Sequence, residues 1–369
     1  MQLLTGVTLP LLLQDVNAAD ITKNVIVTSG LEYDSNPVLS ETNRNPVWTY
    51  RIAPQLLLDA TDEANRWFFD GTILVERHSN EKALIDREDP RLSAGWTRTY
   101  ASGFFGIKAD YQDSSSRIAE LQSTGVFVNS DGTQRTRALS ANWQHEISPR
   151  WTVLTDGAFT NVNYSNSGSL VSYDLSEIAS TLTYAYTEKL NTSIKLDFAR
   201  YRPAQFFNDT NLSHVIFGAN YQVKDGFNLA ARAGIYNLSG QQSDYGWEGS
   251  LAADYIVERM IYRAAISREI LPSGVGGFQK TDSLKLASIF NMTEHDRIGA
   301  NYDFSRYRKD TDINLNALDY QQLGAFYERN LSNHWKSNFS VAHKKLDFPG
   351  VASQANVVGV SLIYDALSF

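Results

Sequence analysis

The sequence predicts an all-β protein, a transmembrane antiparallel β-barrel of about 18 strands, and three observations lead to this prediction. Apolar and polar residues alternate along most of the chain with the two-residue period of a strand. The connections between the alternating runs are in turn short and long. Aromatic residues, which make up 12% of the chain, gather at the ends of the apolar faces, as they do at a membrane interface.

Composition narrows the alternatives. A chain of 369 residues has room for two or three soluble domains or for one large barrel. The absence of cysteine excludes a disulfide framework and thiolate chemistry. The sequence has no apolar run of 18 residues, which excludes a transmembrane helix. The net charge of -8 disfavours nucleic acid as a partner.

The first residues are typical of the end of a secretory signal. An apolar core runs from Leu3 to Leu13, and Val16-Asn17-Ala18 suits cleavage after Ala18. The basic start of such a signal is missing, since the first basic residue is Lys23. We therefore expect residues 1–18 to be a signal peptide, truncated at its start, and residues 19–369 to form a single outer-membrane barrel domain.

The alternating runs have the length that a bilayer requires. In the run from Trp48 to Leu58, for example, Trp48, Tyr50 and Ile52 share one face, while Thr49 and Arg51 share the other. Runs of roughly 9 to 15 residues match a tilted strand that crosses the membrane. Counting them gives eighteen strands, with sixteen as the alternative.

The lengths of the connections predict the orientation of the barrel. Tight turns alternate with longer polar segments, and outer-membrane barrels have short periplasmic turns and longer external loops. A soluble β-propeller or solenoid, the competing fold, has no reason to sort its connections in this way. The short turns include 60–65, 148–150 and 224–226, and the long segments include 34–46, 78–90, 114–134, 203–211, 272–281 and 309–318.

The inward faces predict a wide, hydrated lumen of mixed charge. Eighteen strands enclose an aqueous channel rather than a packed core. Opposite charges on adjacent strands are expected to pair across the wall, and no one-sided ring of basic residues indicates a dedicated anion pore. The charged lumenal candidates are Arg51, Arg232, Arg263, Asp254, Asp303 and Glu328.

Several aromatic residues also fall on the inward face. Each ring could pack under a loop, or it could offer an apolar plate to the C–H face of a sugar. Taken together, they favour a path for a glycan. These candidates are Tyr173, Tyr201, Tyr236, Tyr307 and Phe326.

Catalytic and metal motifs are absent from the sequence, so no enzyme activity, cofactor or metal is expected. Ser213 precedes His214, but adjacent residues on a strand point to opposite faces and cannot act as a nucleophile and its base. There is no H-x-x-x-H motif and no phosphate-binding glycine loop. The Gly-rich segment "LPSGVGGFQK", residues 271–280, is predicted to be an external loop.

One short stretch suggests a family. The segment "GLEYDSNP", from Gly30 to Pro37, ends the first predicted strand, where Asp34 and Asn36 can cap a turn and Pro37 stops the ladder. The segment and the barrel organisation resemble the β-barrel porin 2 family. This resemblance implies an outer-membrane channel that exports an exopolysaccharide or capsular polysaccharide. Its implied partners are the lipid bilayer, the polymer, a periplasmic polysaccharide export protein and the barrel assembly machinery.

Other functions remain open. A passive diffusion porin for small hydrophilic solutes is the main alternative, and residues 114–134, with the apolar patch Val126-Phe127-Val128, could fold inward as its constriction. A structural or adhesive barrel would act through its external loops. An outer-membrane hydrolase would depend on His78 and His214 near the outer rim.

Overall fold

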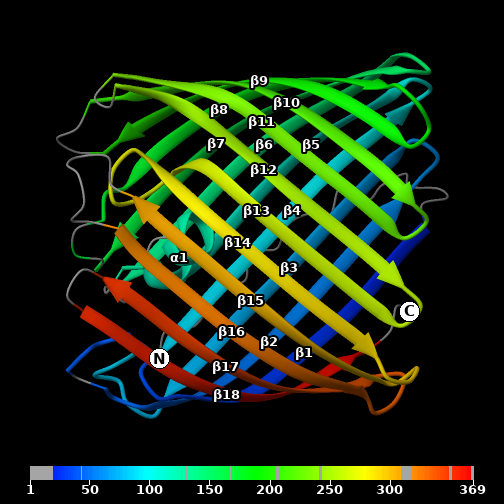
Figure 1. Ribbon diagram of the computed structural model, residues 1–369. Coiled ribbons are helices and arrows are strands. Elements are labelled where there is room, and N and C mark those ends of the chain that lie inside the picture. The colour runs from blue at the N-terminus through cyan, green and yellow to red at the C-terminus, as the bar shows by residue number, and fades with distance from the viewer. Residues whose placement is uncertain are drawn as a thin grey trace, which may run out of the picture.

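The computed structural model describes most of the chain (Figure 1). The described residues are 20–42, 44–125, 127–128, 132–166, 168, 170–204, 208–240, 243–308, 317–348 and 351–366. The predicted signal peptide therefore lies outside the described residues, as do Val126 and residues 309–316 of one long segment. Within the described ranges, no helix is both long and apolar enough to cross a membrane.

The described chain forms eighteen antiparallel strands that close into one barrel, with one short helix inside it (Figure 1). The predicted fold class is confirmed, and the alternative of sixteen strands is wrong. The elements are β1 (Asp20–Asp34), β2 (Val47–Thr61), β3 (Asn65–His78), β4 (Arg87–Tyr100), β5 (Gly103–Ser115), α1 (Ser116–Thr124), β6 (Thr133–Ser148), β7 (Trp151–Ser165), β8 (Tyr173–Ala185), β9 (Leu190–Pro203), β10 (Thr210–Lys224), β11 (Phe227–Gly240), β12 (Asp244–Val257), β13 (Met260–Pro272), β14 (Phe278–Asn291), β15 (Asp296–Arg308), β16 (Ala317–Asn330), β17 (Trp335–Phe348) and β18 (Val351–Asp365).

Pairing of the first and last strands closes the barrel. Each strand pairs with its neighbours in sequence, and β1 also pairs with β18, from Ile26 opposite Asp365 to Asp34 opposite Val357. Closure is necessary because a bilayer offers no water to an unpaired strand edge.

The two faces of the wall meet different solvents. On β2, the outward Trp48 and Tyr50 are 51% and 45% exposed, while the inward Thr49 between them is 3% exposed. The same alternation places large apolar side chains on the outside of the other strands, for example Leu251 on β12 and Phe339 on β17. An apolar outer belt around a closed barrel is solvated by lipid, so this protein is an outer-membrane barrel.

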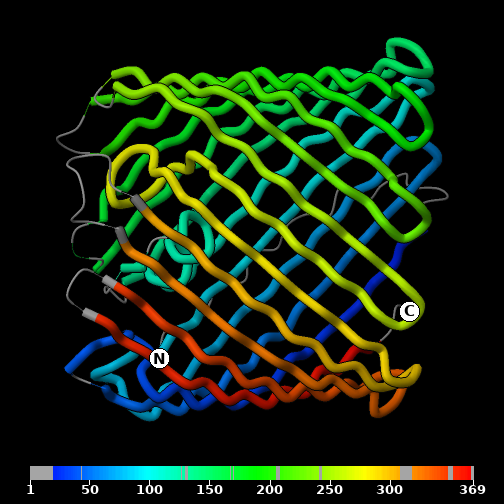
Figure 2. Tube along the Cα trace, viewed as in Figure 1, coloured from blue at the N-terminus to red at the C-terminus, as the bar shows by residue number. Residues whose placement is uncertain are grey.

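The connections alternate as predicted. Turns after even-numbered strands are short and gather at one end, on the right in Figure 2. In the β2–β3 turn, the carboxylate of Asp62 accepts hydrogen bonds from the amides of Ala64 (2.9 Å) and Asn65 (2.7 Å). These bonds hold the pKa of the Asp62 carboxyl below its usual value. Connections after odd-numbered strands are mostly longer, but those between β11 and β12 and between β17 and β18 are short.

The segment after β5 folds into the barrel as α1 (Figure 1). Of residues 114–134, which the porin alternative allows to fold inward, residues 116–124 do so as a helix, while 114–115 and 133–134 belong to β5 and β6. The helix ends at Gly125, whose φ of 72° is left-handed and whose amide donates to the carbonyl of Leu121 at 3.1 Å. Glycine suits this cap because it lacks a Cβ.

The β13–β14 hairpin also enters the lumen at its external end. Ladder pairing between β12 and β13 extends from Val257–Met260 only to Gly249–Arg268. Beyond that point, Ile270 and Phe278 are buried in a cluster with inward side chains of β8–β11. The prediction that residues 271–280 form an external loop is therefore wrong in its placement, because the tip of the hairpin packs inside the barrel.

Candidate functional site

A buried carboxylate ties the helix α1 to a nearby strand and to the hairpin that enters the lumen. Glu120 is 1% exposed. It accepts hydrogen bonds from the hydroxyl of Tyr164 on β7, from the hydroxyl of Ser273 (2.6 Å) and from the amide of Gly274 (3.1 Å). Ser273 and Gly274 form the tip of the β13–β14 hairpin, so a single side chain joins three parts of the chain.

Both ends of α1 have further anchors. At its C-terminal end, the carbonyl of Thr124 accepts from the hydroxyl of Thr281 on β14 at 2.6 Å. At its N-terminal end, the guanidinium of Arg117 donates to the carbonyl of Pro37 at 3.0 Å. Since α1 also continues directly from β5, it is held from several sides of the barrel and obstructs the lumen.

The segment after β1 supports the helix. The carboxylate of Asp34 accepts from the amide of Asn36 at 2.9 Å, which confirms the predicted turn. Asn36 is only 1% exposed, and its side-chain amide donates to the carbonyls of Ser40 (2.8 Å) and Gln354 (3.2 Å). Asn36 thus also fixes the turn to β18, and the adjacent Pro37 accepts the hydrogen bond from Arg117. The sequence did not indicate this role of Asn36.

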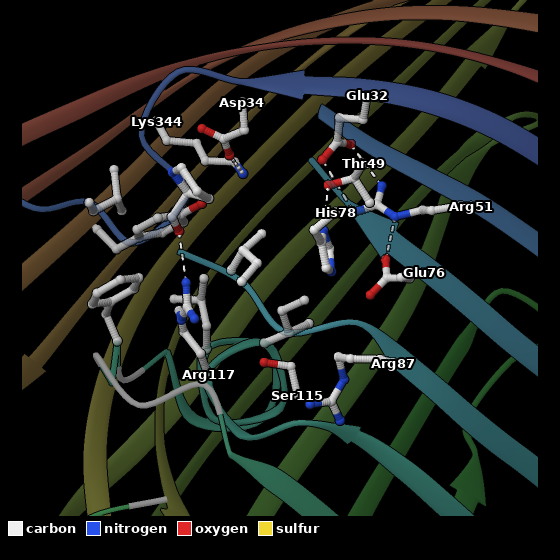
Figure 3. A pocket seen from close by; sticks show the side chains of 17 residues that line it. Glu32, Asp34, Thr49, Arg51, Glu76, His78, Arg87, Ser115, Arg117 and Lys344 are labelled. Carbon is white, nitrogen blue, oxygen red and sulfur yellow. Dashed lines mark hydrogen bonds and ion pairs between the residues drawn. The ribbon is translucent and has the colours of Figure 1, made fainter. Parts of the chain in front are cut away.

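An outer cavity of about 110 Å³ lies between α1, this first connection and the ends of β1–β3 (Figure 3). Arg51 bridges two carboxylates on its wall, with distances of 2.8 Å to Glu32 and 2.5 Å to Glu76. Lys344 pairs with Asp34 at 3.1 Å. The lining also includes the polar side chains of Arg87, Ser115 and Arg117. Its apolar or aromatic members are Leu39, Leu84, Ile118, Leu121, Phe127 and Tyr320.

A larger inner cavity of about 820 Å³ lies beneath α1, against β13–β18 and the first two strands. The two cavities share six residues, which we call the neck. The neck combines two cations and one carboxylate with three apolar or aromatic side chains. Its members are Glu32, Arg51, Ile118, Leu121, Tyr320 and Lys344.

The strand registers place all eleven predicted site residues on the inward face. Arg51, Asp303 and Phe326 line the inner cavity. The expected cross-strand pairs are present, because Arg263 lies 3.4 Å from Asp254 and Glu328 lies 2.7 Å from Arg297. Arg232 donates to the hydroxyl of Ser250 at 3.0 Å and lies 3.6 Å from the carboxylate of Glu269.

The predicted aromatic residues behave differently from one another. Tyr173, Tyr201 and Tyr236 are 7%, 1% and 4% exposed, and they pack with the inserted hairpin instead of facing the open lumen. Tyr307 donates to the side chain of Gln279 at 3.0 Å on the same hairpin. Only Phe326 of the five lines a described cavity.

Sequence reasoning missed Glu120, although a signal for it was present. Ser116, Glu120 and Thr124 recur every four residues, and Ile118 and Leu121 are three apart, before Gly125. This spacing is that of a short helix with one polar and one apolar face.

His78 and His214, on which an outer-membrane hydrolase would depend, do not share a partner in the described structure. His78 hydrogen-bonds to Thr49 at 2.9 Å, and His214 bonds to Glu248, so the two have separate partners. Among the described residues, no group of three or more histidine, aspartate or glutamate side chains could hold a metal ion.

Comparisons with known proteins identify the fold but no family. No model of a protein family and no curated protein matches the sequence, so the resemblance to the β-barrel porin 2 family has no support from them. Solved outer-membrane proteins do match in structure. The protein opdK of Pseudomonas aeruginosa has 10% identity and a TM-score of 0.54 over 95% of this chain and 99% of its own.

Two further solved structures match over a similar share of both chains. OccAB3 of Acinetobacter baumannii has 8% identity and a TM-score of 0.54, over 95% of this chain and 100% of its own. OpdQ of Pseudomonas aeruginosa has 8% identity and a TM-score of 0.55, over 95% of this chain and 98% of its own. At such identities the likeness concerns the fold alone, which is that of an outer-membrane β-barrel.

Proposed function

We propose that this protein is a constricted channel through which small hydrophilic solutes diffuse across the outer membrane. The observation that carries the proposal is the position of α1, which crosses the lumen and is anchored by Glu120, Thr124 and Arg117. A solute that enters from the outside meets the outer cavity, the neck and the inner cavity in turn. The neck therefore sets the size limit.

The charges around the neck suit hydrated solutes that pass without tight binding. Arg51 and Lys344 are each already paired with carboxylates, so a passing charged group exchanges one partner for another. Arg51 and Lys344 keep 36% and 27% of their side chains exposed toward the lumen, while Glu76 and Asp34 are each 7% exposed. Weak exchange favours flux because a solute that is held strongly leaves slowly. Arg51, Asp303 and Phe326 are the sequence candidates that we propose to contact solute.

The similar structures agree with a small cargo. OpdK of Pseudomonas aeruginosa, which has 8% identity and a TM-score of 0.55 to this chain, has been solved with vanillate, a small organic molecule. The likeness lends support to passage of small solutes and does not identify the solute for this chain.

Export of a polysaccharide, the function implied by the sequence resemblance, has weaker support. A moving polymer would need a continuous path, and α1 stands across the lumen. Three of the aromatic side chains expected to guide the polymer, Tyr173, Tyr201 and Tyr236, are buried. If a deletion strain accumulated polymer in its periplasm, that result would support polysaccharide export over passive diffusion.

Channel recordings test the proposal. In planar bilayers, the wild-type protein should give small conductance steps. Replacement of residues 116–124 by a Gly/Ser segment of equal length should raise the conductance and should admit larger sugars into liposomes that hold the protein. Substitution of the exposed Glu81 and Lys82 by alanine in the β3–β4 connection is the control. Folded wild-type protein that gives neither conductance nor solute uptake would overturn the proposal.

A further inference from the structure

The ladder between β12 and β13 stops before either strand ends. The last pair at the external side is Gly249 with Arg268, yet β12 begins five residues earlier, at Asp244, and β13 continues to Pro272. Residues 243–308 are described without a gap, so the separation is a feature of the structure. The neighbouring ladder of β13 and β14 runs to the end of β13, at Pro272 opposite Phe278. The hairpin end thus remains a paired unit after it leaves the wall.

The residues that follow the last pair explain why the strands part. One step beyond Gly249–Arg268, Glu248 would lie directly opposite Glu269 on the inward face. Like charges in that position destabilise a pair of strands. In the structure Glu248 bonds instead to His214 on β10, and Glu269 lies 3.6 Å from Arg232 on β11.

The ladder between β14 and β15 runs to Lys280 opposite Arg308. The separated part of the hairpin is therefore residues 269–279, which is called the leaf. Ile270 and Phe278 lie on the faces of β13 and β14 that point to lipid farther along these strands. In the leaf they are 5% and 4% exposed and belong to the same cluster as Tyr201 on the inner wall. Its tip is fastened by polar bonds, since the carbonyl of Ser273 accepts from the hydroxyl of Tyr201 at 3.1 Å. The bonds of Glu120 to Ser273 and Gly274 join the leaf to α1.

The sequence of the leaf also fits the barrel wall. If the β12–β13 register continued, Trp247 would lie beside Ile270 and Tyr245 beside Pro272, all on the lipid face. Trp247 and Tyr245 are 59% and 84% exposed in the present structure, so this part of the lipid face has room for a neighbour. Proline is tolerated at such a strand end because the pairing there can do without its missing N–H.

From these observations we infer that the leaf is a gate with two positions. In the closed position, which the structure shows, it lies inside the barrel and is fastened to α1. In the open position it joins β12 in the wall and frees the lumen in front of β8–β11. This inference rests on the proposed channel function and adds its regulation.

Each position of the leaf has contacts that the other lacks. Closing buries Ile270 and Phe278 and makes the bonds to Glu120, whereas opening adds backbone pairs with β12 and places Ile270 against lipid. The charges of Glu248 and Glu269 oppose the open position. Glu269→Gln should therefore shift the balance toward the open position, while Glu269→Asp, which keeps the charge, should not.

Paired cysteines can trap each position, because the chain has no cysteine of its own. Trp247→Cys with Ile270→Cys should cross-link only when the leaf is in the wall, since Ile270 is otherwise buried with Tyr201. Val171→Cys with Val275→Cys should cross-link only when the leaf is inside, where the amide of Val171 donates to the carbonyl of Gly274 at 2.7 Å. The four single variants are the controls, and heat-modifiable electrophoretic mobility verifies folding.

The measurement is single-channel conductance before and after oxidation, and again after reduction. We expect the wall cross-link to hold a conductance severalfold above the wild-type step and the inner cross-link to hold the low step, both reversibly. Glu269→Gln without any cross-link should raise the fraction of time spent in the high step. Folded, conducting protein that never forms the wall cross-link, together with a Glu269→Gln variant that behaves as wild type, would overturn the gate. Loss of conductance in every form, wild type included, would instead refute the channel function.

Discussion

The carboxylate of Glu120 accepts a hydrogen bond from the hydroxyl of Ser273 at 2.6 Å, across 153 residues of sequence. Glu120 lies on α1, and Ser273 lies at the tip of the β13–β14 hairpin. Two separate insertions into the lumen are thereby joined in one buried contact. The contact therefore links the two segments that lie inside the barrel.

Glu120→Gln should loosen the obstruction. A glutamine has only one acceptor oxygen for the donors of Tyr164, Ser273 and Gly274, and its NH₂ group faces donors. Each donor left without a partner costs about 1–3 kcal/mol when buried. We expect more frequent large openings in planar bilayers, with Glu81→Gln on an exposed connection as the matched control. Openings identical to those of the wild type would show that α1 is held by its other anchors.

Arg51→Gln should make the channel more selective for cations. The substitution leaves Glu32 and Glu76 without the guanidinium that now lies between them, so the neck gains net negative charge. The reversal potential in a salt gradient measures this shift. Arg66→Gln, which removes the cation of the exposed Arg66–Asp59 pair near the periplasmic turns, should move the reversal potential much less. An unchanged potential in Arg51→Gln would mean that ions avoid the neck.

Leu251→Arg and Ala252→Arg should differ sharply, although the two positions are adjacent. Leu251 faces lipid in the middle of β12, where an arginine costs about 2–4 kcal/mol. Ala252 faces the lumen between Ala230 and Ala265, where an arginine is hydrated. Folding titrations in urea with lipid vesicles should show destabilisation for Leu251→Arg alone. Equal destabilisation would contradict the assignment of faces.

The β2–β3 turn should weaken in acid. The folded state lowers the pKa of Asp62, so the stabilisation is complete above the ordinary aspartate pKa of about 3.9 and is lost as the pH falls through the lower folded value. Asp62→Ala should remove this part of the pH dependence. Folding titrations at several pH values between neutral and strongly acidic test it, with Asp225→Ala in the β10–β11 turn for comparison.

The barrel could be predicted from sequence because lipid imposes a rule on every second residue. The side chains of Trp48 and Tyr50 face lipid and that of Arg51 faces the lumen, whichever strands pair with β2. The alternation can therefore be recognised without knowing the neighbouring strands. The inward orientation of Arg51, Asp303 and the other candidates followed from the same rule. The alternation also made the short and long connections recognisable.

The interior could not be predicted in the same way, because it depends on residues that are distant in sequence. The separation of β12 from β13 depends on Glu248 and Glu269 falling opposite each other, which only the register reveals. The burial of Tyr201 depends on the hairpin that covers it, and the position of α1 depends on Ser273. A loop rich in glycine, such as residues 271–280, gives no local sign that it will pack inside a barrel.

The turn after β1 has a consequence for assembly. Asn36 holds Gln354 across 318 residues, so this contact forms only when the last strand has reached the first. The same turn supports Arg117 through Pro37, and so the helix receives its final support at closure. A barrel caught before closure therefore has both a free sheet edge and an incompletely seated helix. Closure of the sheet is thus expected to complete the support of α1.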